Sequence, residues 1–121
     1  MLTTSFAEHF AKDWIESWNS HDLERILSHY TDDFEMSSPL IATVVGEPGG
    51  MLKGKEAIGA YWSKALTKFP NLKFELEGVY VGAVSIVLTY TNVTRGVKAA
   101  EVFYFNEDGK VYRASGNYLT P

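Results

Sequence analysis

The hydrophobic spacing of this chain changes at Pro70, and this change limits the folds that the chain can adopt. Before Pro70, apolar residues mostly recur every three or four positions, as Phe6, Phe10, Trp14 and Trp18 do. This is the spacing of one face of an amphipathic helix. After Pro70 they alternate with polar residues, which is the spacing of half-buried strands. Helices that come first and strands that come last predict an α+β fold, with the helices packed on one face of a sheet.

Three helices are expected in the first 70 residues. The first begins at a capping box formed by Ser5 and Glu8. The second is a short segment, 23–30, for which Ser20 is the candidate cap. The third runs from about Lys55 to Phe69, where proline stops it. At least four strands are expected after residue 72.

A strand is also expected between the second and third helices, followed by a long connection. Phe34, Met36 and Ser38 share one face of this strand, and Pro39 ends its regular pairing. The segment 40–53 is long for a connection in a compact domain and contains several glycines. It is therefore either a lid or binding loop, or an ordinary surface loop with a short strand at 41–45.

Composition excludes several classes of function. The 121 residues suit one domain, 1–121, with a single core. Lys and Arg total 11 against 15 Asp and Glu, and the net charge of −4 disfavours nucleic acid as a partner. The absence of cysteine excludes disulfides and thiolate chemistry. Neither a membrane span nor the apolar stretch of a signal peptide is present, so we expect a cytoplasmic protein with no membrane partner.

Glu101 is the most informative single residue for chemistry. It alternates with Phe103 and Phe105 in a predicted strand, and a short hairpin would place Gly116 opposite it. The complete face would carry Glu101, Phe103, Phe105, Tyr112, Ala114, Gly116 and Tyr118. A carboxyl group among aromatic rings is costly to ionise, so its pKa should rise and allow acid or base catalysis near neutral pH. Alternatively, Glu101 faces solvent, because the other face of the strand is also apolar.

Other polar residues carry weaker signals. Ser38 is either a pocket hydroxyl or the partner of a turn amide. His9 and Asp13 lie one helical turn apart, but no metal-ligand motif is present, and we expect neither a metal nor a cofactor. The glycines before Lys53 lack the spacing of a phosphate-binding loop.

Three parts of the chain resemble the nuclear transport factor 2-like superfamily, and within it the SnoaL-like and ketosteroid-isomerase-like branch. They are WIESWNSHDLE at 14–24, HYTDDF at 29–34 with Ser38-Pro39 and LKGKEAI at 52–58, and EVFYFNEDGKV at 101–111. The resemblance implies a curved antiparallel sheet wrapped around a conical pocket, with three helices from the N-terminal half. It is specific for the fold and unspecific for activity, since this fold hosts many functions.

The isomerases of this branch use a carboxylate base and an oxyanion hole of a tyrosine and a protonated aspartic acid. The resemblance places Ser38 at the base, Trp14 at the oxyanion tyrosine and Glu101 at the protonated acid. Tyr30 matches a supporting tyrosine, and Tyr118 matches an aromatic residue of the pocket wall. A serine hydroxyl cannot replace the carboxylate base unaided, so isomerisation by that route is not expected.

The sequence therefore predicts a pocket for a small, largely apolar molecule. Its expected lining is Trp14, Trp18, Tyr30, Met36, Trp62, Phe103 and Tyr118. Glu101, with Ser38 beside it, would carry acid or base catalysis of the isomerase, cyclase, dehydratase or hydrolase type. Two alternatives stay open: a pocket that binds without catalysis, and a module whose main role is association.

A homodimer through the outer face of the sheet is also expected. That face should carry Ser85, Val87, Thr89, Thr91, Val102, Tyr104, Arg113, Ser115 and Asn117. It contains one formal charge, and its β-branched and tyrosine side chains suit packing against a second sheet. The alternative is a solvated sheet face.

Overall fold

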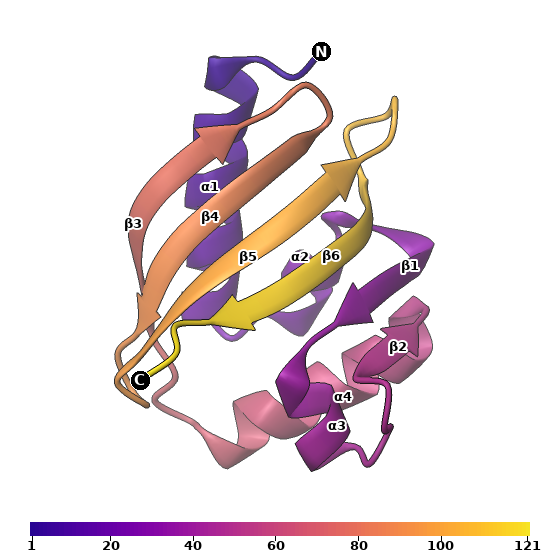
Figure 1. The fold of residues 1–121 in the computed structure, drawn as a ribbon, viewed down its shortest axis with the longest axis vertical. Helices are drawn as coiled ribbons and strands as arrows, with labels where there is room; N and C mark the ends of the chain where they lie inside the picture. The colour runs from indigo at the N-terminus through magenta and orange to yellow at the C-terminus, as the bar shows by residue number, and fades with distance from the viewer.

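The computed structural model describes residues 1–121 as four helices and one curved sheet of six strands (Figure 1). The helices are α1 (Thr4–Asn19), α2 (Leu23–Leu27), α3 (Pro39–Val44) and α4 (Lys55–Lys68). The strands are β1 (Tyr30–Ser37), β2 (Met51–Lys53), β3 (Phe74–Val81), β4 (Ser85–Asn92), β5 (Val97–Phe105) and β6 (Val111–Tyr118). The predicted α+β class and the four strands after residue 72 are confirmed. None of the helices combines the length and the apolar character needed to cross a bilayer.

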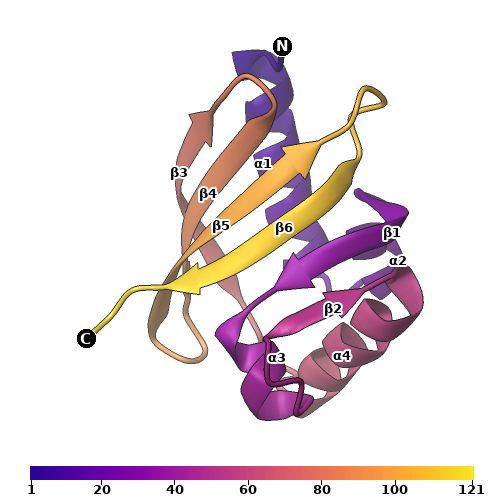
Figure 2. The same ribbon diagram turned by 45° about the vertical axis from the view of Figure 1, so that its right-hand side comes forward.

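The sheet has the order β2-β1-β6-β5-β4-β3, and one of its pairs is parallel. Strands β3 to β6 form an antiparallel meander, and β2 pairs antiparallel with β1 at the edge (Figure 2). The sheet is antiparallel, as expected, in every pair except that of β1 with β6. Helix α2 delivers the chain to β1 at the end of the sheet where β6 begins, with Tyr30 beside Val111. The two strands therefore run in the same direction.

Register shifts in the ladders bend the sheet. One lies between Leu76 and Gly78 in β3, and another displaces β6 against the end of β5, where Phe105 pairs with Val111. Such irregularities increase the local twist and curvature of a strand. The second shift also changes which residues face inward: Val111 is buried and Tyr112 is 44% exposed. The predicted inward position of Tyr112 was wrong because the bulge breaks the alternation.

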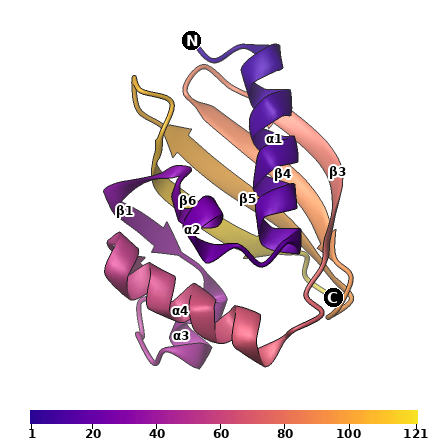
Figure 3. The ribbon, with the colours of Figure 1, turned by 180° about the vertical axis from the view of Figure 1, so that it is seen from behind.

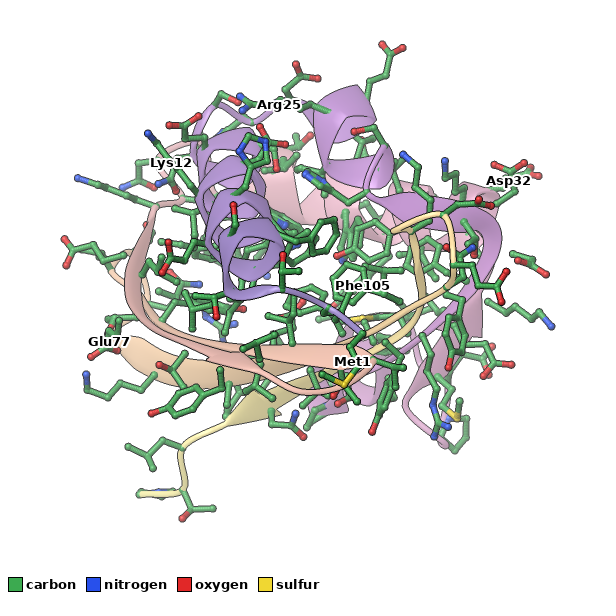
Figure 4. The ribbon with its side chains drawn as sticks, turned by 90° about the horizontal axis from the view of Figure 1, so that it is seen from above. Met1, Lys12, Arg25, Asp32, Glu77 and Phe105 are labelled. Carbon is green, nitrogen blue, oxygen red and sulfur yellow. The ribbon has the colours of Figure 1, made fainter.

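Helix α1 lies across the concave face of the sheet (Figure 3). Its predicted apolar stripe is buried, with Phe10, Trp14 and Trp18 between helix and strands. Seen from above, Phe105 lies between the two layers, whereas Lys12 points away from them (Figure 4). The N-cap is Thr3, not the predicted capping box, since the Thr3 hydroxyl accepts the backbone N–H of Phe6 at 3.0 Å.

Hydrogen bonds connect the C-terminal end of α1 to the segment at the start of β3. The Asn19 amide donates to the carbonyl of Phe74 and accepts its N–H, at 3.0 and 2.8 Å. His21, in the left-handed region with a φ of 58°, contacts the Leu72 carbonyl through Nε2 at 2.8 Å. Helix α2 is a single turn capped by Asp22, not Ser20. The second predicted helix was too long, because Ser28 and His29 form a turn and Tyr30 begins β1.

The core between these layers predicts a large effect for truncation of Phe103. This side chain is fully buried, with its ring centroid 5.0 Å from that of Phe10 and 5.3 Å from that of Trp14. We expect Phe103→Ala to lower the free energy of unfolding by about 3–5 kcal/mol. Leu119→Ala, at a residue 70% exposed, should cost less than about 0.5 kcal/mol. Urea titrations measure both, and a loss below about 1 kcal/mol for Phe103→Ala would contradict this packing.

Candidate functional site

A cavity of about 300 Å³ lies between the concave face of the sheet and helices α1, α3 and α4. Its lining is mostly apolar and aromatic, and its buried members include Trp14, Trp18 and Trp62. The indole of Trp18 packs edge-on against that of Trp62, with 5.3 Å between ring centroids. The helices thus supply one wall of the cavity and the strands supply the other.

Glu101 lies in the strand wall of this cavity. It pairs with Leu88 of β4 and with Gly116 of β6, and only 5% of it is exposed. Its Oε1 accepts the hydroxyl of Tyr90 at 2.8 Å. The inward orientation of Glu101 is therefore correct, and the solvent-facing alternative was wrong. The register of β5 with β4 and with β6 sets this position of the Glu101 side chain.

Burial makes the carboxyl group of Glu101 unusual. Loss of solvation raises its pKa to about 7, and the hydrogen bond from Tyr90 offsets part of this shift. The shift has the predicted direction and cause. No Lys, Arg or His forms an ion pair with this carboxylate. Near neutral pH both protonation states of Glu101 are therefore populated, so it can accept or donate a proton.

The glycine opposite Glu101 lets three cavity residues approach the backbone of β6. A Cβ at Gly116 would lie 3.5 Å from the Tyr118 hydroxyl oxygen, 3.6 Å from the Met36 methyl carbon and 3.6 Å from the Ser38 Cβ. A side chain longer than that of alanine at this position would therefore displace these residues. All four, Met36, Ser38, Glu101 and Tyr118, line the cavity.

Ser38 combines the two roles that the sequence left open. Its hydroxyl accepts the backbone N–H of Leu40 at 3.2 Å and caps α3, and it lies 3.5 Å from the Tyr118 hydroxyl inside the cavity. The predicted short strand at 41–45 was wrong, because this cap and Pro39 at the first helical position begin a helix there. Helix α3 places Leu40, Thr43 and Val44 in the cavity wall, and the last two of these are exposed.

The turn after α3 returns the chain to the sheet through Gly50. The Ser38 N–H donates to the Gly50 carbonyl at 2.9 Å. Gly50 has a φ of 67°, and a Cβ there would lie 3.0 Å from the Ser38 carbonyl oxygen. Glycine is the residue that fits this close approach. The wall residue Ser38 is thus held from both sides, by α3 and by this turn.

Two of the predicted lining residues lie behind the cavity instead. Phe103 does face inward, but Phe10 and Trp14 cover it. Tyr30 is buried in the core, where its hydroxyl accepts the indole N–H of Trp14 at 3.0 Å. Trp14 therefore contributes its ring to the cavity, while its only polar group is already bonded. The lining prediction was wrong for Phe103 and Tyr30, because side-chain packing decides what is covered.

Several lining residues had not been identified from the sequence. Tyr90 belongs to the predicted inward alternation of β4, so the pattern contained a signal for it, but its contact with Glu101 depends on strand register. Tyr61 follows Ile58 at the spacing of one helix face in the third predicted helix, so the pattern contained a signal for it too. Arg95 lies in the turn between β4 and β5, and no local pattern places it at a cavity.

A second polar cluster, outside the cavity, is an ion-pair network between α1 and the residues around α2. Asp13 accepts hydrogen bonds from Arg25 and from Nε2 of His29, and Arg25 also pairs with Glu16. Arg25 is the main cause of the lowered pKa of Asp13. The structure contains no group of three His, Cys, Asp or Glu residues arranged to hold a metal ion. The network links α1 to the segment around α2.

Comparison with known proteins adds a family and close structural relatives. A family model, the SnoaL-like domain, matches residues 11–114. A SnoaL-like protein from Burkholderia thailandensis E264 is 47% identical, with a TM-score of 0.94 and 98% of each chain covered. No protein of curated function matches the sequence.

Two more distant structures share the fold. A candidate isomerase of the SnoaL-like family from Agrobacterium tumefaciens strain C58 is 18% identical, with a TM-score of 0.76 and coverage of 97% of this chain and 100% of that one. AclR, a candidate hydroxylase from Streptomyces galilaeus, is 16% identical, with a TM-score of 0.74 and coverage of 97% and 77%. At these identities the similarity shows the fold alone. The chemistry of the cavity depends on its own residues, which are described above.

The buried acid predicts a stability that depends on pH. The folded pKa of Glu101 is about 7 and its ordinary value is 4.5. The stability that it contributes is therefore complete below pH 4.5 and is lost as pH rises through 7. We expect the free energy of unfolding to fall by about 2–3 kcal/mol more between pH 5 and pH 8 in the natural protein than in Glu101→Gln.

Urea titrations at several pH values measure this difference. The matched control is Glu75→Gln, since Glu75 is an exposed carboxyl group on the same sheet, and this variant should keep the pH dependence of the natural protein. Identical pH dependence in all three proteins would show that Glu101 is solvated.

Proposed function

Since the chain belongs to the SnoaL-like domain family, we propose that its cavity binds a small, largely apolar molecule on which Glu101 acts as general acid or base. One observation carries this proposal. A carboxyl group with no cationic partner lies in the wall of an apolar cavity, with a pKa near the working pH of a cell. Burial of such a group costs stability when the group ionises, as expected of a functional residue.

The surroundings of Glu101 suit a proton transfer. The carboxylate form accepts a proton from a C–H or O–H of the bound molecule, and the acid form returns it at another atom. Burial raises the pKa of Tyr61 to about 12 and that of Tyr118 above its ordinary value, so both phenols stay protonated at neutral pH. They, and the hydroxyl of Ser38, are available to donate hydrogen bonds to a developing oxyanion.

The proposal favours reactions in which one base moves a proton within an apolar substrate, as in an isomerisation or a cyclisation. These reactions need a base and a donor, and this cavity holds both kinds of group. The candidate isomerase with the same fold is consistent with such chemistry. With Ser38 in place of a second carboxylate, Glu101 has to serve as the base itself.

A generic test of a buried base uses 5-nitrobenzisoxazole, a small apolar substrate. A base removes its ring C–H proton, the N–O bond breaks, and a coloured cyanophenolate forms in the same step. We expect catalysis by the natural protein to rise as pH increases through about 7, following ionisation of Glu101. Glu101→Gln should lower the rate by at least about 100-fold, and Glu75→Gln should leave it unchanged.

The same variants separate catalysis from simple binding. N-phenyl-1-naphthylamine, a neutral apolar dye, reports entry into the cavity by its fluorescence. If the dye binds but Glu101→Gln changes neither its affinity nor the elimination rate, the cavity is a binding site without acid–base chemistry. If the dye does not bind, the cavity has no role in ligand binding, and the proposal fails as a whole.

We further propose that the chain forms a homodimer through the outer face of the sheet, which no helix covers (Figure 1). Val87 and Val102 pair with each other at the centre of this face, and Tyr104 and Tyr112 lie nearby with ring centroids 6.5 Å apart. Arg113 is the one formal charge among the residues that were assigned to this face. Lys98 and Glu77 lie beside Thr91 at one edge of the same face and pair with each other at 2.9 Å. The centre of the face is therefore apolar enough to pack against its symmetry-related copy.

Sedimentation at micromolar concentration tests the dimer. We expect a mass near twice 13.5 kDa for the natural chain and a monomer for Val102→Glu, which places a charge at the centre of the interface. Val93→Glu makes the same change at an exposed site outside this face and should stay dimeric. A monomer in all three samples would contradict the proposal.

A further inference from the structure

The opening of the cavity carries three cationic side chains. Of the residues that line the cavity, Lys64 and Lys68 of α4 and Arg95 of the β4–β5 turn are exposed, whereas Glu101 and the tryptophans are buried. The two lysines are four residues apart and so share one side of the helix. Figure 3 shows the C-terminal end of α4 running toward the turn that joins β4 to β5. The cations therefore come from both sides of the opening.

These cations have no anionic partners within the protein. The ion pairs of the structure involve Arg25, His29, Lys53, Lys55 and Lys98. Glu101 is the only acidic residue that lines the cavity, and it is buried in the wall. Such a group of unpaired cations contrasts with the chain as a whole, whose net charge is −4.

Phe69 holds two of the cations beside the cavity. The Lys68 ammonium lies 5.7 Å from the centroid of the Phe69 ring, and the Arg95 guanidinium lies 5.9 Å from it. Both distances suit a cation–π contact. Phe69 itself lines the cavity, so an apolar wall residue and two positive charges meet at one place.

The charge of Arg95 also acts inside the cavity. It lowers the pKa values of Tyr61 and Tyr118, against the upward effect of their burial. Its backbone N–H donates to the side-chain oxygen of Asn92 at 3.2 Å, and Asn92 lines the cavity too. Arg95 is thus part of the cavity wall and not a freely solvated residue at a distance from it.

We infer that the molecule bound in this cavity is an amphiphilic anion, with an apolar body against the aromatic wall and an acidic group at Lys64, Lys68 and Arg95. The inference rests on the proposed function and names the chemical class of its ligand. It also defines the orientation of the ligand in the cavity. The anionic group stays at the exposed opening, where it does not raise the cost of ionising Glu101, and the apolar end reaches the buried acid.

Two dyes with the same aromatic skeleton test this inference. 8-Anilinonaphthalene-1-sulfonate carries a sulfonate, and N-phenyl-1-naphthylamine lacks it. We expect the sulfonate dye to bind about tenfold more tightly at low salt, and the preference to shrink in 0.5 M salt, which screens charges at an exposed opening.

Charge variants identify the residues responsible. Lys68→Gln combined with Arg95→Gln should remove most of the preference for the sulfonate dye and leave the affinity for the neutral dye within about twofold. Lys12→Gln combined with Lys73→Gln is the matched control, because it changes the net charge equally at two exposed residues outside the cavity. The control should keep the preference.

The outcomes separate this inference from the proposed function. Equal affinity for the two dyes, or a preference that survives in Lys68→Gln with Arg95→Gln, overturns the anionic ligand while the binding cavity stands. Binding of neither dye overturns both. If the control variant also loses its preference for the sulfonate dye, the preference comes from the overall charge of the protein, and the inference is overturned.

Discussion

The indole of Trp14 is the contact on which the arrangement of helix and sheet depends. Its ring lies 5.8 Å from that of Phe74 in a near-parallel stack, 5.4 Å from Tyr90 and 5.3 Å from Phe103, so it touches β3, β4 and β5 at once. Its N–H donates to the hydroxyl of Tyr30 in β1. One side chain of α1 thereby fixes the helix over four strands, with its polar atom satisfied.

A cavity of about 300 Å³ remains next to this packing. The tryptophans of α1 and α4 line one side of it, and residues of the sheet, Glu101 among them, line the other. Interiors normally close such space, because empty volume forfeits dispersion contacts. The cavity beside Trp14 is an exception to this rule.

The buried carboxyl group of Glu101 is physically linked to an aromatic frame formed by the rings of Trp14, Phe74, Tyr90 and Phe103. The frame excludes water from the acid and so raises its pKa, and the phenol of Tyr90, itself packed on Trp14, supplies its one hydrogen bond. A change in the frame therefore alters both stability and the proton affinity of the acid. Sites that act on ligands commonly bury polar groups at a cost to the stability of the folded protein.

The sequence by itself determined the elements that have a local cause. The spacing of apolar residues predicted α1, α4 and the four-stranded meander, because one-sided burial imposes a period of 3.6 on helices and of two on strands. The same alternation placed Glu101 on one face with Phe103 and Phe105, but it left open whether that face turns inward, because the other face is apolar too. Helix α3 escaped prediction because it is too short to show a period, and only the Ser38 cap and Pro39 mark its start.

Only the tertiary structure decided which residues meet across elements. The bulge that turned Tyr112 outward, the parallel pairing of β1 with β6 and the position of Arg95 at the cavity all depend on contacts between distant segments. Phe103 was placed on the correct face by its alternation, yet the rings of α1 cover it. Periodicity defines the face that a side chain occupies, but coverage depends on the volumes packed against it, and these become fixed only when helix and sheet come together.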